Sequence, residues 1–350
     1  MSASIAHLSD TRQTWLRQLL PQGVPALWCP LLTPYQADGQ VDAARLSRHL
    51  ASIAGSVGGL LVPGSTGDGW QLADAEARAL LKRLLPLARA HGTAVLIGLL
   101  KADTTAVLHQ LRDTLAWLRR LTGAETDLAA MRAAGVCGFT ACPPSGAGLS
   151  QDTIRESLDQ LLATGLPFAL YQLPQVTGNE MSPDTVAWLA ARHPNFLWFK
   201  DTSGADRVAA AGVREVFLVR GAEGGYSRHL SGHGGAYDGF LLSTANVFAA
   251  PLAQVLDHLA HGEPAAAQAL SARIGAVVDP VFAEAGALPF GNAFTNANKA
   301  IDHWMAHGPA ALNVPGPRLY SGHTLPSPLI ALAGEALRAQ GLMPVRGYLD

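Results

Sequence analysis

The sequence predicts an α/β protein, a parallel (β/α)8 TIM barrel with a C-terminal helical extension. Eight short apolar segments alternate with amphipathic helical patterns, and turn-forming residues follow the apolar segments. The length of 350 residues suits one such barrel with an addition. We expect an N-terminal lead helix over residues 1–23, the barrel over residues 24–263 and a helical extension packed on the barrel over residues 264–350.

Four strands make up the first half of the expected barrel. They are Pro25–Leu32, Gly58–Val62, Thr93–Leu99 and Gly135–Cys142. The first strand stops at Thr33-Pro34 and the fourth at Pro143, and proline ends a central strand because it lacks a backbone donor. The helical period runs over residues 42–54, 73–90 and 104–134, and the last of these stretches is broken near Thr122-Gly123.

The second half continues the same alternation. Its strands are Pro167–Leu173, the apolar run that ends at Lys200, Val216–Val219 and Gly239–Leu242. Helices are expected at Gln151–Ala163, Pro183–Arg192, Tyr226–Leu230 and Ala249–His261. Three further helical patterns, Ala265–Ala285, Asn292–Ala306 and Ser327–Gln340, form the extension.

The composition excludes several classes of function. Hydrophobic residues make up 49% of the chain and charged residues 15%, which is typical of a compact globular protein. The net charge of −2 provides no basic surface for nucleic acid or an anionic membrane. The start of the chain lacks the apolar core of a signal peptide, and no apolar run reaches the roughly 18 residues of a membrane span. We therefore expect a cytoplasmic protein without nucleic-acid or membrane partners.

Lys200 is the first candidate for chemistry. It follows four large apolar residues, Phe196–Phe199, and a polar turn comes directly after it. A short apolar run of this kind is typical of a strand buried on both faces. Burial disfavours the ammonium form, so the pKa of Lys200 should fall and leave a nucleophilic amine. The alternative is a lysine that extends from the strand end into solvent.

Two other strand ends carry candidate binding groups, since chemistry in such a barrel lies at the carboxyl ends of the strands. Gly64-Ser65-Thr66-Gly67 leads into a helix, where free N–H groups and the helix dipole favour an anion such as a carboxylate. The alternative is a turn whose hydroxyls cap the helix. Tyr171 ends the fifth strand and could transfer protons in the barrel mouth, or simply pack its ring.

Together these segments resemble the dihydrodipicolinate synthase / N-acetylneuraminate lyase family of class I, Schiff-base aldolases. Gly64–Asp68 is similar to the GTTGE motif of the family, Tyr171–Pro174 to its YNxP motif, and Phe199–Gly204 to its KD-S-G motif. The segments occur in the family's order, and the likeness extends over residues 24–342.

The resemblance implies that Lys200 forms an imine with the keto carbon of pyruvate or a pyruvate-like 2-oxo acid. It also implies that Ser65 and Thr66 hold the substrate carboxylate and that Tyr171 relays protons. The Gly221 carbonyl and the Leu241 side chain would line the pyruvate end of the site. The imine itself withdraws electrons, so neither a metal nor an organic cofactor is expected. The family resemblance suggests a homodimer or homotetramer.

Two departures from the family bear on the substrate. Val176 stands two residues after the YNxP proline, where the dihydrodipicolinate synthases carry an arginine that can bind a second carboxylate. Pro143-Pro144-Ser145 replaces the tyrosines that follow their fourth strand. We therefore expect an aldolase or dehydratase acting on a 2-keto-3-deoxy sugar acid or another 4-substituted 2-oxo acid. The alternatives are 4-hydroxy-tetrahydrodipicolinate (dihydrodipicolinate) synthase and a non-catalytic barrel that binds a 2-oxo acid.

Overall fold

The protein forms a closed barrel of eight parallel strands, as the sequence predicts. A computed structural model describes residues 2–350. The strands follow one another around the barrel in chain order, and β10 closes it against β3. They are β3 (Leu27–Pro30), β4 (Gly59–Val62), β5 (Ala94–Gly98), β6 (Val136–Ala141), β7 (Phe168–Gln172), β8 (Phe196–Asp201), β9 (Phe217–Arg220) and β10 (Gly239–Leu241).

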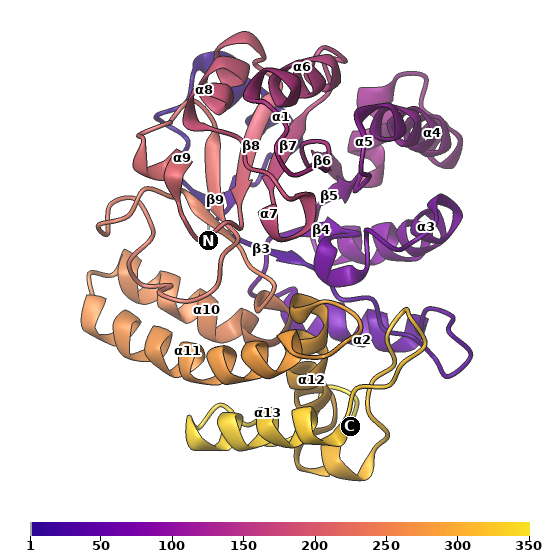
Figure 1. Ribbon diagram of the computed structural model, residues 1–350, viewed down its shortest axis with the longest axis vertical. Helices are drawn as coiled ribbons and strands as arrows, with labels where there is room; N and C mark the ends of the chain where they lie inside the picture. Colours follow the sequence, from indigo (N-terminus) through magenta and orange to yellow (C-terminus); the bar gives the residue numbers. More distant parts are fainter. Residues whose placement is uncertain (1) are drawn as a thin grey trace.

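Helices surround the barrel, as Figure 1 shows. They are α2 (Ala43–Ile53), α3 (Asp74–Ala90), α4 (Thr104–Thr122), α5 (Asp127–Ala134), α6 (Gln151–Leu162), α7 (Pro174–Thr177), α8 (Pro183–Arg192), α9 (Arg207–Ala210) and α10 (Ala245–Ala260). Side-chain caps begin several of them; the Asp103 carboxylate, for example, accepts from the Ala106 N–H at the start of α4. Gly123, with φ of 71°, ends α4 and separates it from α5, where the sequence predicts a break.

Two expectations in the second half need correction. Residues 226–230 are not a helix: Leu230 pairs with Tyr237 in an isolated bridge, and the preceding Gly224 and Gly225 have positive φ. The helix expected from Ala249 begins four residues earlier, because Phe248, whose φ is −123°, joins a short first turn to the rest of α10.

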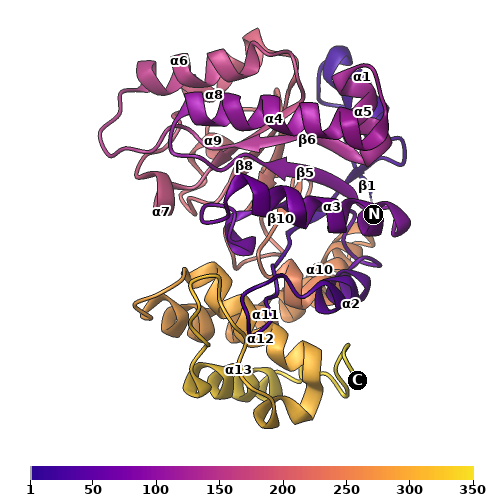
Figure 2. The same ribbon diagram turned by 90° about the vertical axis from the view of Figure 1, so that its right-hand side faces the viewer.

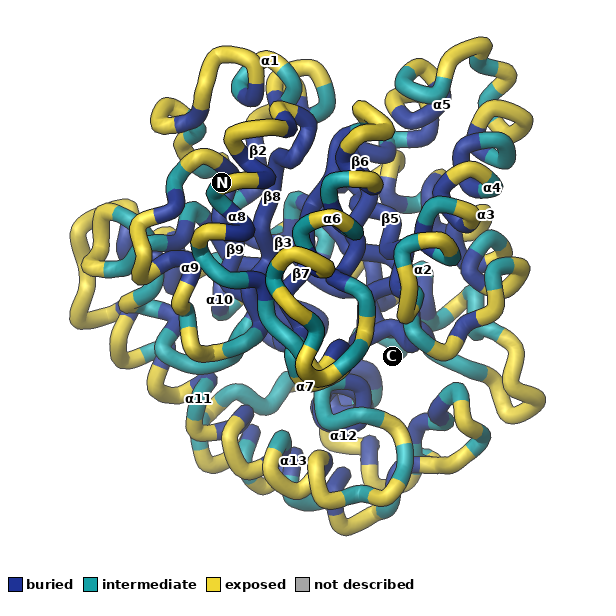
Figure 3. Tube along the Cα trace, turned by 45° about the horizontal axis from the view of Figure 1, so that its top comes forward, coloured by how far each residue is buried: buried dark blue, intermediate teal, exposed yellow. Residues whose placement is uncertain are grey.

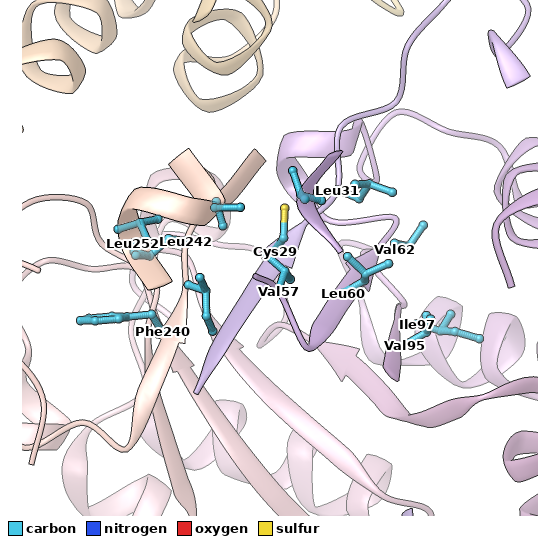
Figure 4. Packing of buried hydrophobic residues seen from close by; sticks show 14 of the residues in the cluster. Cys29, Leu31, Val57, Leu60, Val62, Val95, Ile97, Phe240, Leu242 and Leu252 are labelled. Atoms are coloured by element: carbon cyan, nitrogen blue, oxygen red, sulfur yellow. The ribbon is translucent and has the colours of Figure 1, made fainter. Parts of the chain in front are cut away.

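The strand side chains form two apolar layers. Along β4, Leu60 and Val62 belong to the large layer between strands and helices, whereas Leu61 belongs to the layer inside the barrel. Figure 4 shows part of the outer layer, with residues from β3, β4, β5 and β10, and Figure 3 shows the strands as the buried centre of the molecule. Inside the barrel, Trp28 meets Trp198 edge to face, with ring centroids 6.0 Å apart.

The lead segment lies at the amino ends of the strands. β1 (Ser2–Ala3) pairs with β2 (Val24–Pro25), and α1 (Asp10–Leu19) lies between them in the chain. Leu16 of α1 is buried in the inner apolar layer. The buried Arg12 donates from Nε to the Phe196 carbonyl, at 3.0 Å, where β8 begins. This end of the barrel is therefore filled, and the carboxyl ends remain for a site.

The extension forms a separate layer of helices on one side of the barrel, in orange and yellow in Figures 1 and 2. It contains α11 (Pro264–Gly286), α12 (Ala293–His307), the 3-10 helix η2 (Gly308–Asn313) and α13 (Ser327–Ala339). Contacts of α11 and α12 with α10, and of α12 with the 3-10 helix η1 (Ser65–Gly67), join it to the barrel. Within residues 2–350, no helix is both long and apolar enough to cross a membrane.

Candidate active site

Lys200 lies near the carboxyl end of β8 and is only 3% exposed. Burial lowers its pKa to about 7, against opposing contributions from Cys142, Glu223 and Cys29. Burial also raises the pKa of both cysteines, which keeps them as thiols, so the Glu223 carboxylate is the negative charge that acts on the lysine. A large share of the Lys200 side chains is therefore the neutral amine near pH 7.

Tyr171 is the register partner of Lys200 on the neighbouring strand β7. The Lys200 Nζ lies over the Tyr171 ring, 3.7 Å from its centroid. Burial, with a contribution from Cys142, raises the pKa of Tyr171, while hydrogen-bonding groups of Thr202 and Ser65 act in the opposite direction. The side chain is thus a protonated phenol at neutral pH, and it can donate a proton next to the amine.

Ser65 and Thr66 form η1, a one-turn 3-10 helix that precedes α3 by six residues. The anion site therefore lacks the dipole of a long helix and depends on backbone donors. In the described chain, the N–H groups of Ser65 and Thr66 donate no hydrogen bond, whereas the next two N–H groups are used within the turn. Both side chains are buried, and the Ser65 Oγ accepts from Trp70 Nε1 at 2.8 Å.

The η1 turn is braced from both sides. The Thr295 hydroxyl of α12 donates to the Thr66 carbonyl at 3.1 Å, and the Thr33 hydroxyl donates to the Gly67 carbonyl at 2.9 Å. Asp68 follows the turn in the left-handed region, with φ of 64°. Its carboxylate accepts from the Tyr35 hydroxyl at 2.9 Å and lies 3.7 Å from the buried Lys299 ammonium of α12. The extension therefore helps to hold the turn in place.

Gly221 lies where any side chain would collide with Thr202 and Lys200. Its N–H donates to the Asp201 carbonyl at 2.6 Å, and a Cβ at this position would lie 2.8 Å from Lys200 Cε. Only glycine allows the backbone to approach the lysine so closely. Leu241 is buried in the inner apolar layer with Val219, the residue that pairs with Lys200 across β8 and β9. The structure thus brings Lys200, Tyr171, the η1 turn and Gly221 together, with Leu241 in the layer inside the barrel.

Glu223 is a functional candidate that the sequence analysis missed. Its two carboxylate oxygens accept from the Ser243 hydroxyl at 2.7 Å, the Thr244 hydroxyl at 2.6 Å, the Thr244 N–H at 3.1 Å and the Tyr226 hydroxyl at 3.0 Å. Four donors hold the charge in one position near Lys200. Its position in the sequence, two residues after Gly221 and at the end of a strand, could have identified Glu223 as a candidate.

A second missed group holds the segment that carries Glu223. The buried Arg220 guanidinium donates to the carbonyls of Ala222 at 2.6 Å and Gly224 at 3.2 Å. Asp206 pairs with the same guanidinium at 3.1 Å. Because the arginine binds the backbone on both sides of Glu223, it positions that carboxylate rather than contacting the substrate site.

The two departures from the family motifs lie in the segments that follow strands β6 and β7. Val176 is 43% exposed, on α7. Ser145 is exposed, and its N–H donates to the Ala102 carbonyl at 2.8 Å. In the part of the chain that the structure describes, no three His, Cys, Asp or Glu side chains gather in a way that could hold a metal ion.

Comparisons with known proteins place the chain in a family. The model of the dihydrodipicolinate synthetase family matches residues 124–297. A 4-hydroxy-tetrahydrodipicolinate synthase of Xanthomonas axonopodis pv. citri is 32% identical over 248 residues, which cover 70% of this chain and 76% of the relative. A second, from Sorangium cellulosum, is 32% identical over 177 residues, which are 50% of this chain and only 53% of that relative.

A solved structure has the same fold. YagE, a prophage protein of the dihydrodipicolinic acid synthase family from E. coli K12 in complex with pyruvate, matches with a TM-score of 0.69. Its sequence is 20% identical, and the match covers 91% of this chain and 99% of that one. This structural match agrees with the eight-stranded barrel. The chain therefore belongs to the dihydrodipicolinate synthetase family, and with it to the Schiff-base-forming lyases.

Proposed function

We propose that this protein is a class I aldolase or dehydratase that forms an imine between Lys200 and C2 of a 2-oxo acid, pyruvate being the smallest. The observation that supports it most directly is a buried amine with a pKa of about 7, stacked on the protonated Tyr171. An ordinary lysine has a pKa near 10.5 and is almost entirely protonated at neutral pH. Lys200 therefore has far more of the nucleophilic form.

The η1 turn orients the substrate. The free N–H groups of Ser65 and Thr66 bind the C1 carboxylate, which sets the C2 carbonyl against the Lys200 Nζ. Nζ attacks C2, the carbonyl oxygen leaves as water, and the imine takes up one proton from solvent and becomes cationic. Gly221 and Leu241 border the small end of the site in this arrangement.

The charge of the imine is stabilised by two features of the site. The Tyr171 ring lies against Nζ, and the Glu223 carboxylate raises the pKa of the lysine, so both favour a cation at this place. The cationic imine accepts the electrons of the breaking bond. Either the C3–C4 bond breaks while the C4 hydroxyl loses its proton, which releases an aldehyde, or C3 loses a proton to give the enamine, which expels the C4 hydroxyl as water once that oxygen is protonated.

Tyr171 transfers the proton that this bond change requires. In the addition direction the enamine carbon C3 attacks the aldehyde carbon, and the aldehyde oxygen takes the phenolic proton. Hydrolysis of the imine then regenerates the free amine of Lys200 and releases a 4-hydroxy-2-oxo acid. Because the raised pKa keeps the phenol protonated at neutral pH, the proton is available when the new C–C bond forms.

The 2-keto-3-deoxy sugar acids are one substrate class for this reaction. 4-Hydroxy-tetrahydrodipicolinate synthase is a second candidate function, supported by the names of the curated relatives. Val176 and Pro143-Pro144-Ser145 argue against it, because they provide neither the guanidinium nor the phenol that the synthase motif carries. A coupled assay with pyruvate and aspartate semialdehyde decides between them, and turnover there would favour the synthase.

Borohydride trapping with pyruvate tests the imine itself. Peptide mass spectrometry should find a reduced pyruvate adduct on Lys200 and none on Lys299, a second buried lysine whose pKa is also lowered by burial. Lys200→Ala should abolish the adduct and all turnover, while Lys82→Ala on the exposed face of α3 should change neither. Turnover that survives in Lys200→Ala would contradict the mechanism. An adduct without turnover of any 2-oxo acid would favour the non-catalytic binder.

A further inference from the structure

A small apolar cluster lies beside Tyr171 at the carboxyl end of the barrel. Leu100, Cys142 and Leu173 are buried in it, and Trp70 and Phe294 pack against it while remaining partly exposed. We infer that the substrate carries an apolar alkyl or aryl group beyond C4, so that the enzyme joins pyruvate to an apolar aldehyde or cleaves the product of that addition. This inference rests on the proposed function.

The orientation of the C4 substituent follows from the groups that bind C1, C2 and the oxygen on C4. The η1 turn takes C1 and Lys200 takes C2, so the chain from C3 onward must lead away from both. Tyr171 gives its proton to the oxygen on C4, which requires C4 to lie beside the phenol. The substituent on C4 therefore points into the cluster around that ring, which Leu100, Cys142 and Leu173 line.

Several polar groups near the cluster are already hydrogen-bonded within the protein, although the Asn298 Oδ1 has no partner. Glu223 accepts four hydrogen bonds, as described above. The Asn298 Nδ2 donates to the Ser243 hydroxyl at 2.9 Å and to the Phe294 carbonyl at 2.8 Å, which uses both of its hydrogens. The cluster itself offers only apolar side chains beyond the Tyr171 phenol and the Cys142 thiol, and the Trp70 Nε1 hydrogen is bonded to Ser65. A substituent with several hydroxyls would lose water against these side chains, whereas an apolar group would gain by leaving water.

The extension contributes to this wall. Phe294 lies in the first turn of α12, and its ring meets Phe282 of α11 edge to face, with centroids 6.1 Å apart. The Asn298 bond to its carbonyl holds the same turn. Trp70 on the barrel side is fixed by its bond to the Ser65 hydroxyl. Two aromatic rings, one from each part of the chain, thus border the place of the C4 substituent.

A panel of aldehydes tests this assignment, with pyruvate as the common partner. We expect kcat/KM for benzaldehyde and hexanal to exceed that for glyceraldehyde and erythrose about tenfold or more. Phe294→Ser should lower kcat/KM for the apolar aldehydes about tenfold and leave pyruvate trapping on Lys200 unchanged. Phe290→Ser is the matched control, because that ring stacks on His323 and lies outside the cluster. If Phe294→Ser fails to fold, Phe294→Leu with the same panel replaces it and should lower the benzaldehyde rate most.

The outcomes separate this inference from the proposed function. If pyruvate is trapped on Lys200 but hydroxylated aldehydes react as well as the apolar ones or better, the apolar assignment is wrong and the imine chemistry stands. Equal effects of the Phe294 and Phe290 substitutions would also overturn it. If no pyruvate adduct forms on Lys200 in the folded protein, the proposed function fails and this inference fails with it.

Discussion

Raising the pH through 7 should switch on imine formation at Lys200. The pKa of this lysine is about 7, whereas the ordinary value is 10.5. At pH 7 about half of the side chains are neutral, compared with about three in ten thousand for an unperturbed lysine, so burial raises the reactive fraction about a thousandfold. The trapping rate with pyruvate should therefore rise tenfold per pH unit below the midpoint and level off above it.

The substitution Glu223→Gln tests whether the Glu223 carboxylate influences the pKa of Lys200. The carboxylate stabilises the ammonium, so its removal should lower the pKa of Lys200 further and move the midpoint to a lower pH. The amide keeps the size of the side chain and an oxygen that can accept from Ser243. The assay is the initial rate of borohydride trapping between pH 5 and 10, measured by mass spectrometry. Glu215→Gln, the same substitution at a second glutamate, is the control.

Two results would refute this reasoning. A wild-type midpoint near 10 would mean that the lysine is not desolvated in solution, and the argument from burial would fall. A midpoint that rises in Glu223→Gln would mean that the carboxylate does not act on the lysine as a negative charge. An unchanged circular dichroism spectrum is required for both proteins before the midpoints are compared.

Three further substitutions test other parts of the structure. Gly221→Ala should reduce pyruvate trapping about tenfold or more in a folded protein, because the new Cβ would lie 2.8 Å from Lys200 Cε. Thr295→Val should raise KM for pyruvate about fivefold with little change in kcat, because one neutral hydrogen bond to the η1 turn is lost; a fall in kcat alone would contradict it. Asp302→Asn should destabilise the protein by about 3–5 kcal/mol at pH 7 in urea unfolding, because it removes a buried carboxylate from the partly buried Arg45 guanidinium. Burial raises the pKa of Asp302, but His49 and Arg45 together hold it below its usual range. The difference in the free energy of unfolding between the wild type and Asp302→Asn should therefore narrow as the pH falls below about 4.

The fold could be predicted because its signal is local. Each strand is an apolar run closed by a turn, and the order of strands in a parallel barrel follows the chain. The helix predicted at Tyr226–Leu230 is wrong for a tertiary reason. Leu230 pairs with Tyr237, and the Tyr226 hydroxyl donates to Glu223, so contacts with distant residues decide the conformation of a segment whose local pattern suited a helix.

The candidate site could be predicted only in part. Lys200, Tyr171 and the Ser65-Thr66 turn each follow a strand, so the rule that chemistry lies at strand ends finds them. Glu223 is harder to find, because its importance depends on Ser243 and on donors from another loop. Phe294 and Thr295 could not be found in this way. They lie in a helix of the extension, and nothing in a helical apolar pattern says which barrel loop the helix will meet.

The extension explains how a barrel can keep a buried amine in place. A lysine whose pKa falls from 10.5 to about 7 costs the folded state about 4 kcal/mol at pH 7, because the unfolded chain holds the proton more tightly. The interior around Lys200 must therefore be rigid enough that the side chain cannot escape to water. Strands supply this rigidity on the barrel side, but η1 is a single turn with unused donors. The bonds from Thr295 and Lys299 hold that turn from outside, so α12 stabilises the part of the site that the barrel alone leaves loose.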